Sequence, residues 1–234
     1  MKRVLTLTAA SFLLAFPCAK AADDDNPARE ALQSLNEYIG TWKGVGGPDR
    51  SSPPENWKET MSWSWRFKGD DAWMVVQFKD GKYFSTGEMR YLPDKKKYQL
   101  TLTDKNKKDV KLEFQGELKK GYLSLERQDK SGDAHMIRMN IAGGGVRFVY
   151  TFSRKSKGST IFTKLYDVNF SKEGEALAGG GKEKECVVTG GLGTIAVTYM
   201  GKTYYVCCTG CRDAFLENPE KIIKDYEARK KKGN

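Results

Sequence analysis

Four of the five cysteines in the 234-residue chain lie near its C-terminal end, and their side chains are well suited to chemistry. Twenty residues separate Cys186 from Cys207, three separate Cys207 from Cys211, and Cys208 forms a C-x-x-C pair with Cys211. Thiolates grouped in this way bind soft or borderline metal ions, such as Cu(I), Zn(II) and heavier ions. The same four thiols could instead form structural disulfides, which are typical of small domains in oxidising compartments.

The elements around the cysteines are expected to bring Cys186 close to the later pair. Apolar alternation predicts a β-hairpin from segments 194–199 and 203–206, with a turn at 200–202. The hairpin returns the chain so that Cys186 can face Cys207 and Cys211. A helix is expected directly after Cys211, and a second helix from Asn218. Backbone N–H groups at a helix start lower the pKa of a nearby thiol, which favours the metal-binding thiolate.

The segment 184–234 resembles the YHS/TRASH heavy-metal-binding modules. The resemblance implies a small treble-clef-like fold in which Cys186, Cys207 and Cys211 bind the metal. It also implies a metal-transport or resistance protein as a partner, because these modules occur in metal sensors, transporters and resistance proteins. The matching residues are, in order, Cys186, Thr189, Gly190, Tyr199, Gly201, Lys202, Tyr204, Tyr205, Val206, Cys207, Cys208, Gly210, Cys211, Phe215, Asn218, Pro219, Glu220 and Lys221.

Two positions depart from the pattern of that family. Thr189 stands where many members have a second cysteine, and Val187 stands where proline is common. Coordination by four thiolates would therefore require Cys208, although adjacent residues of a strand point in opposite directions. A site of three thiolates would suit Cu(I) or a heavy metal better than structural zinc.

The N-terminal residues have the pattern of a secretory signal peptide. Lys2 and Arg3 precede the uncharged apolar segment 4–16, and the small residues Ala19 and Ala21 suit a signal peptidase. We therefore expect cleavage after Ala21 and a periplasmic or secreted protein. Cleavage would lower the formal charge from +10 to about +7 and leave no transmembrane segment.

The segment between the signal peptide and the cysteines predicts a mainly β domain. A short helix is expected to begin at Asn26 and Pro27, which suit a helix cap and a first helical turn. Apolar and polar residues alternate in 57–67, and similar alternation between turn signals recurs through 146–152. About ten such strands predict an antiparallel up-and-down barrel, because closure removes the exposed edges of a sheet.

A short helix leads into Gly40, Thr41 and Trp42 before this meander, and the combination resembles the calycin-type barrels. That group includes lipocalins, fatty-acid-binding proteins and bacterial relatives, and the resemblance implies that Trp42 packs across the closed end. The Gly-rich segment 175–183 is expected to be a linker. The chain then divides into a signal peptide (1–21), a calycin-like barrel (22–174), the linker (175–183) and a YHS/TRASH-like domain (184–234).

The interior of the barrel is a second candidate site. Trp57, Trp63 and Trp65 lie on the apolar face of one strand, where they either line a ligand cavity or pack as core. Glu59 falls on the same face and would either bind a polar group of a ligand or lie in water at the barrel mouth. In this alternative, the protein carries a small apolar ligand and the C-terminal cysteines form disulfides.

The sequence disfavours several other functions. His135 is the one histidine, and its strand gives no context for haem binding, so we expect it at the surface or at a strand end. The lysines near the predicted hairpin ends do not alternate with aromatic residues, which argues against nucleic-acid binding. The sequence shows no nucleophile beside a base and no phosphate loop, so we expect no enzyme and no organic cofactor. The prediction is an exported protein that binds a thiophilic metal ion, Cu(I) or Zn(II).

Overall fold

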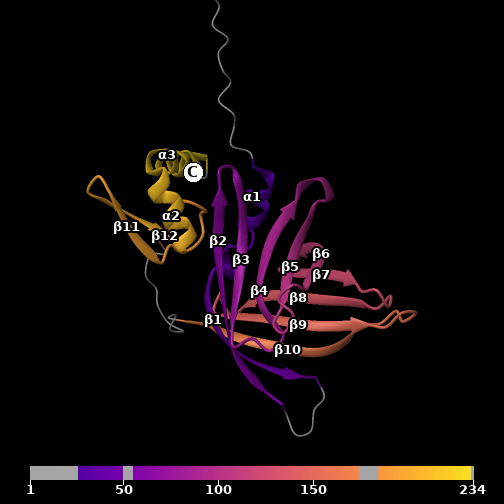
Figure 1. Cartoon of the computed structure of the whole chain (residues 1–234). Helices are drawn as coiled ribbons and strands as arrows, with labels where there is room; N and C mark the ends of the chain where they lie inside the picture. The colour runs from indigo at the N-terminus through magenta and orange to yellow at the C-terminus, as the bar shows by residue number, and fades with distance from the viewer. Residues whose placement is uncertain (1–25, 50–54, 174–183, 233–234) are drawn as a thin grey trace, which may run out of the picture.

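The computed structural model describes residues 26–49, 55–173 and 184–232. Figure 1 shows a large β-barrel with a smaller C-terminal region, made of one hairpin and two helices, beside it. The predicted signal peptide (1–21) and linker (175–183) lie outside the described residues, so both stay predictions. Within the part of the chain that is described, no helix is both long enough and apolar enough to cross a bilayer.

Ten antiparallel strands form a closed barrel, which confirms the predicted fold class. Consecutive strands pair with each other, and β1 also pairs with β10, so that the sheet closes on itself. Trp42 on β1 shows this closure, because it pairs with Lys172 on one side and with Met61 on the other. The strands are β1 (Gly40–Pro48), β2 (Trp57–Lys68), β3 (Asp71–Lys79), β4 (Phe84–Leu92), β5 (Lys97–Asp104), β6 (Lys111–Lys119), β7 (Tyr122–Gln128), β8 (Ala134–Ala142), β9 (Arg147–Lys155) and β10 (Thr163–Lys172), with a short 3-10 turn η2 (Pro93–Lys95) before β5.

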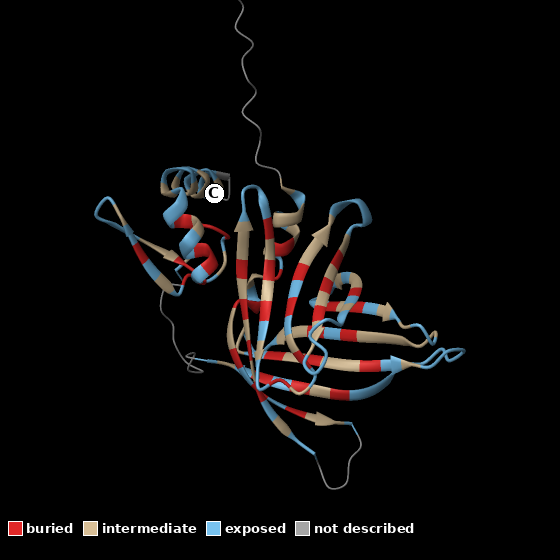
Figure 2. Cartoon of the chain, viewed as in Figure 1, coloured by how far each residue is buried: buried red, intermediate tan, exposed pale blue. Residues whose placement is uncertain are grey.

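Alternate side chains of the strands fill the barrel interior, as the period of two in the sequence predicts. Along β2, Met61, Trp63 and Trp65 are buried, whereas the residues between them are half-buried on the outer face. Figure 2 shows buried positions alternating with more exposed ones on other strands as well. The cavity that remains inside has a volume of about 20 Å³, which is room for about one water molecule. The interior is therefore a packed core in this structure.

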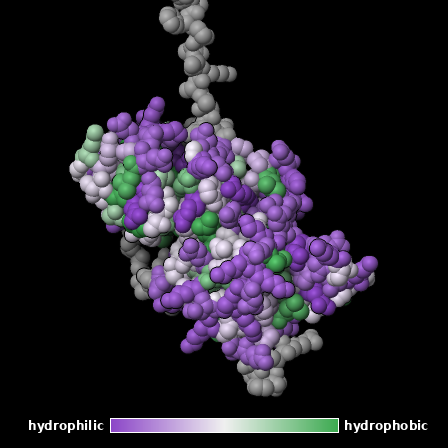
Figure 3. All heavy atoms as spheres, viewed as in Figure 1, coloured by the Kyte–Doolittle hydropathy of each residue, from purple (hydrophilic) through white to green (hydrophobic). Residues whose placement is uncertain are grey.

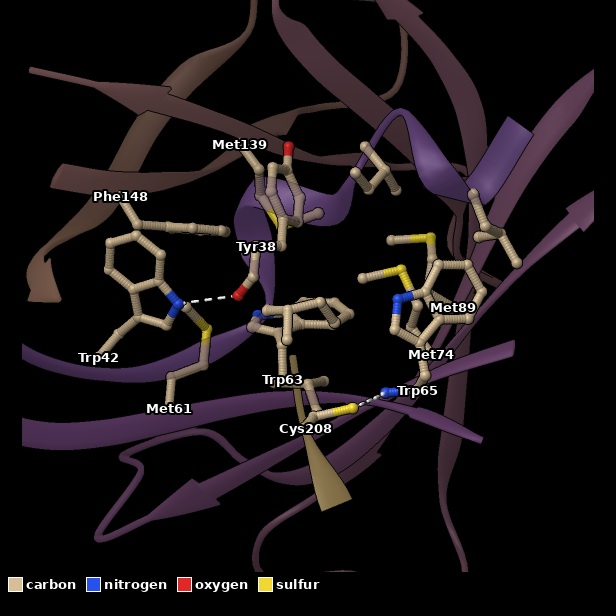
Figure 4. Packing of buried hydrophobic residues seen from close by; sticks show 14 of the residues in the cluster. Tyr38, Trp42, Met61, Trp63, Trp65, Met74, Met89, Met139, Phe148 and Cys208 are labelled. Carbon is tan, nitrogen blue, oxygen red and sulfur yellow. Dashed lines mark hydrogen bonds between the residues drawn. The ribbon is translucent and has the colours of Figure 1, made fainter. Parts of the chain in front are cut away.

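The N-terminal segment packs across one end of the barrel. Helix α1 (Pro27–Gln33) begins where the sequence predicts, and the Asn26 side chain accepts hydrogen bonds from two N–H groups of its first turn. A 3-10 turn, η1 (Asn36–Tyr38), follows the helix. The Tyr38 carbonyl accepts the indole N–H of Trp42 at 2.8 Å (Figure 4). Trp42 is fully buried there, which confirms it as a core residue.

The C-terminal region consists of a two-stranded hairpin followed by two helices, as the sequence predicts. Helix α2 (Thr209–Glu217) begins two residues before Cys211, and not directly after it as the sequence predicts. It packs against β2, where Gly210 lies so close to the Trp65 carbonyl that a side chain at position 210 would collide with it. Buried residues of the barrel and of this region thus form one continuous hydrophobic core. The elements are β11 (Ile195–Tyr199), β12 (Lys202–Val206), α2 (Thr209–Glu217) and α3 (Pro219–Lys232).

Candidate metal centre

Three cysteines from two segments of the sequence meet in the C-terminal region. The sulfur atoms of Cys186, Cys207 and Cys211 all lie within 4.8 Å of one another, and those of Cys207 and Cys211 are 3.4 Å apart. All three are free thiols with buried side chains, and Cys186 and Cys211 are completely buried. Among the described residues, no other group of cysteine, histidine or acidic side chains brings three ligand atoms this close together. We call these three residues the cysteine trio.

A tight turn holds the first member of the trio against the hairpin. The Cys186 carbonyl accepts the N–H of Gly190 at 2.8 Å, and the Cys186 N–H donates to the carbonyl of Gly191 at 2.6 Å. Val187 donates its N–H to the Tyr205 carbonyl on β12 at 2.9 Å. Cys207 directly follows β12, and Cys211 lies in the first turn of α2. The hairpin therefore returns the chain to Cys186, as the sequence predicts.

Cys208 lies beside the trio, but its sulfur atom has a different partner. It directly precedes α2 in an extended conformation, and its sulfur accepts the backbone N–H of Trp65 at 3.3 Å (Figure 4). The sulfur atoms of Cys207 and Cys208 are 3.9 Å apart. The structure thus places Cys208 between the trio and the barrel wall, and its role as a fourth ligand stays a prediction.

Within the cluster, the pKa is lowered at two of the four cysteines and raised at the other two. Hydrogen bonds from Cys207 and Cys211 lower the pKa of Cys186 to about 2, and similar bonds lower the pKa of Cys208 to about 3. The hydrogen bond to Cys186 raises the pKa of Cys207, and burial raises the pKa of Cys211. The hydrogen bonds of the cluster therefore favour ionisation at Cys186 and Cys208 over ionisation at Cys207 and Cys211. A bound metal ion would replace the remaining protons on its ligands, because cysteine binds metal as the thiolate.

The spacing of the sulfur atoms suits a thiolate-bound ion. With metal–sulfur bonds of about 2.3 Å, the sulfurs stand about 4.0 Å apart around a trigonal ion and about 3.8 Å apart around a tetrahedral one. The sulfurs of Cys207 and Cys211 are 3.4 Å apart, and no pair in the trio exceeds 4.8 Å. Side-chain shifts of less than about 1 Å would therefore bring all three sulfurs to bonding distance of one ion.

Two of the barrel residues predicted to bind a ligand form a buried polar cluster. Glu59 is 4% exposed and accepts the indole N–H of Trp57 at 2.8 Å. It also accepts the backbone N–H of Lys82 at 3.3 Å and the hydroxyl of Tyr150 at 3.4 Å. Burial raises the pKa of Glu59, and the three hydrogen bonds oppose that rise. The alternative position for Glu59, in water at the barrel mouth, is wrong, because the side chain is buried.

The other two barrel candidates belong to the packed core. Trp63 lines the small cavity, and Trp65 stacks on Phe67 with ring centroids 5.6 Å apart. The indole N–H of Trp65 donates to Asn36 at 3.1 Å, beneath the C-terminal region. The structure does not bring the four barrel candidates into one site. An apolar ligand would need far more room than the cavity of about 20 Å³ offers, so the carrier function stays a prediction that requires side chains to move.

Among the described residues, His135 does not belong to a group of side chains that could hold a metal ion. It lies near the start of β8, as the predicted strand-end position implies, and its Nε2 atom is 2.9 Å from Oδ2 of Asp129. A polar depression of about 410 Å³ lies nearby, between segments 126–128 and 155–159. The face of the molecule in Figure 3 is mostly hydrophilic.

Sequence reasoning missed Arg29 and Asn36, and it missed the contact of Trp65 with the C-terminal region. Arg29, Asn36 and Trp65 hydrogen-bond to residues 143 to 159 positions later in the chain. Local patterns carry no information about contacts over such separations. Gly210 could have pointed to one such contact, because a glycine permits close approach of another backbone.

No protein-family model matches the chain, and no curated protein matches it significantly. Among solved structures, the crystal structure of Rv2717c from M. tuberculosis is similar, with 16% sequence identity and a TM-score of 0.39. The match covers 61% of this chain and 97% of that chain. The candidate function therefore rests on the geometry of the cysteines.

Proposed function

We propose that the chain is an exported, non-enzymatic protein that captures one thiophilic metal ion with its C-terminal cysteines, while the barrel serves as a scaffold. The observation that carries the proposal is the convergence of the Cys186, Cys207 and Cys211 sulfur atoms within 4.8 Å in a buried site. This convergence supports the resemblance of the segment 184–234 to the YHS/TRASH modules. The proposed export rests on the signal-peptide pattern of residues 1–21.

The number of thiolates favours Cu(I) among the candidate ions. Soft ions accept three thiolates, whereas structural zinc takes four ligands in almost all proteins. Cys208 is the thiol nearest to a fourth position, and its sulfur already accepts the N–H of Trp65. Zn(II) would need Cys208 to turn from Trp65 or would need a water molecule as the fourth ligand.

The experiment that tests this proposal measures metal stoichiometry on the reduced protein. The chain is reduced under anaerobic conditions, loaded with Cu(I) or Zn(II), freed of excess ion and analysed by elemental mass spectrometry. We expect about one ion per chain, because the trio forms one group. Free thiols are counted on the same sample before and after chelation. We expect the cysteines that bind the metal to react as free thiols only after the chelator has removed the ion.

Single substitutions connect the ion to particular residues. Cys186→Ser, Cys207→Ser and Cys211→Ser each remove one thiolate of the trio, and each should reduce retained metal to well below one ion per chain. Circular dichroism identifies variants that remain folded. If the reduced wild-type protein retains neither Cu(I) nor Zn(II), the proposal is wrong.

A further inference from the structure

Three consecutive carbonyl groups next to Cys186 are held by side chains from other elements. The Val187 carbonyl accepts a hydrogen bond from Arg229 of α3 at 2.8 Å, and the Val188 carbonyl accepts one from Arg29 of α1 at 2.8 Å. The Thr189 carbonyl accepts the side-chain N–H of Asn36 at 2.9 Å. Two of these three donors come from the N-terminal segment of the barrel and not from the C-terminal region.

The side-chain amide of Asn36 has a fixed orientation because both its nitrogen and its oxygen form hydrogen bonds. The nitrogen donates to the Thr189 carbonyl, and the oxygen accepts the indole N–H of Trp65 at 3.1 Å. Gly191 packs against the same side chain so closely that a Cβ at position 191 would lie 3.0 Å from the Asn36 Cβ. Asn36 therefore connects the wall of the barrel to the turn that carries Cys186.

The turn that Asn36 holds also reaches the other cysteines. The Thr189 hydroxyl lies 3.6 Å from the sulfur of Cys207. On the far side of the cluster, the Trp65 N–H holds the sulfur of Cys208. A shift of the turn against the barrel would move Cys186 relative to Cys207 and Cys211, because Cys186 belongs to the turn and the other two do not.

We propose that Asn36 is a positioning residue for the metal centre, and that the barrel, through Asn36 and Arg29, sets the distance between Cys186 and the other two thiolates. The inference rests on the proposed function and goes beyond it, since it makes the N-terminal segment part of the metal-binding apparatus. Groups that orient metal ligands through hydrogen bonds matter because a preorganised ligand set loses less freedom on binding. Their removal weakens metal binding by about 10- to 100-fold.

The test compares Asn36→Ala with a matched amide of the barrel wall. Gln115 donates a hydrogen bond from its side chain to Gln99 at 2.9 Å across β5 and β6, far along the barrel from β2, so Gln115→Ala removes a similar contact away from the cysteines. Dissociation constants for Cu(I) and for Zn(II) are measured at 25 °C by competition with a chromophoric chelator. We expect Asn36→Ala to weaken binding by about 10- to 100-fold and Gln115→Ala to leave it within about threefold of wild type.

A second variant keeps the test decisive if Asn36→Ala unfolds. Asn36→Asp retains the acceptor for Trp65 and loses the donor to Thr189, so we expect the same direction of change. Thermal unfolding of the metal-free proteins separates the two roles, because a merely structural residue would lower the melting temperature and leave affinity at 25 °C unchanged.

The outcomes distinguish this inference from the proposed function. A wild-type protein that binds one ion, with folded Asn36 variants that bind it equally well, would overturn the positioning role and leave the proposed function standing. A wild-type protein that binds neither ion would overturn both. Weaker binding by both Asn36 variants, with the Gln115 control unchanged, would support both.

Discussion

The backbone N–H of Trp65 donates a hydrogen bond to the sulfur of Cys208, which takes the place of a missing strand partner. Pairing between β1 and β2 ends at Gly40 and Trp63, so Trp65 lies two residues beyond the last pair on that side. The Cys208 sulfur atom, 3.3 Å from the Trp65 nitrogen, accepts the N–H that has no strand partner at this edge of β2. Cys208 therefore serves the contact between the barrel and the C-terminal region, whereas the other three thiols face one another.

We expect Cys208→Ser to keep about one metal ion per chain and Cys211→Ser to lose it. The serine hydroxyl at position 208 can still accept the N–H of Trp65, and the trio remains intact. At position 211, a ligand of the trio is lost. Elemental mass spectrometry on both purified variants, after loading with Cu(I), provides the comparison. Equal loss of metal in the two variants would show that Cys208 is a fourth ligand.

Gly210→Ala should destabilise the protein even though alanine is the better helix former. The new Cβ would collide with the carbonyl oxygen of Trp65, and overpacking of this kind costs about 1–3 kcal/mol. Thr209→Ala is the control, since Thr209 is exposed in the same helical turn and its loss should change stability by less than about 0.5 kcal/mol. The measurement is unfolding in urea followed by tryptophan fluorescence. Stabilisation by Gly210→Ala would contradict the close packing of α2 on β2.

Glu59→Gln should stabilise the protein at neutral pH and have little effect in acid. Burial raises the pKa of Glu59 in the folded state above its value in the unfolded chain. A raised pKa means that the contribution of Glu59 to stability is fully present below the unfolded pKa and is lost as pH rises through the folded pKa. Glutamine does not titrate, and it can accept from Trp57 and Lys82 while donating to Tyr150.

The check on Glu59 is the free energy of unfolding of both proteins across the acidic-to-neutral range. The advantage of the glutamine variant should grow as pH rises. Glu113→Gln is a suitable control, because Glu113 is exposed on β6 and shows no interaction with the Glu59 cluster. A constant difference across the whole pH range would mean that the ionisation of Glu59 does not oppose folding.

Trp42→Phe should weaken the end of the barrel that the N-terminal segment covers. The change removes the indole donor to the Tyr38 carbonyl and leaves that buried acceptor unpaired, which costs about 1–3 kcal/mol. Trp73→Phe is the control, since Trp73 is half-buried and stacks beneath Arg90 at 4.6 Å on the outside of β3. Calorimetric melting temperatures give the comparison. Equal shifts in the two variants would show that the Trp42 hydrogen bond adds no stability of its own.

Local patterns in the sequence were sufficient to predict the barrel and most of the cysteine centre. Alternation in 57–67 gave the inward face of β2, and the Asn26 cap marked the start of α1. The hairpin and the spacing of Cys186, Cys207 and Cys211 predicted that these cysteines converge, and their sulfur atoms do converge. Such features depend on neighbouring residues, which share one face of a strand or one turn of a helix.

Features that depend on distant contacts could not be predicted from those patterns. The burial of Glu59 depends on Lys82 and Tyr150, which lie 23 and 91 positions away. The packing of α2 on β2 depends on surface shape, which leaves no periodic signal. The filled interior likewise follows from the sizes of many side chains from ten strands, and sequence alone left open whether the tryptophans line a cavity or pack as core.

The hydrogen bond between Arg29 and Val188 spans 159 positions, so helix α1 and the turn that carries Cys186 complete the same structure. Contacts of such long sequence separation form slowly, because the entropy of closing the loop is lost before the contact can compensate for it. Helix α1 can bind the Cys186 turn only after the chain has been synthesised beyond Val188. A chain that ends before Cys211 would lack one member of the cysteine trio, so an ion could reach all three thiols only after residue 211 has been synthesised and the region has folded.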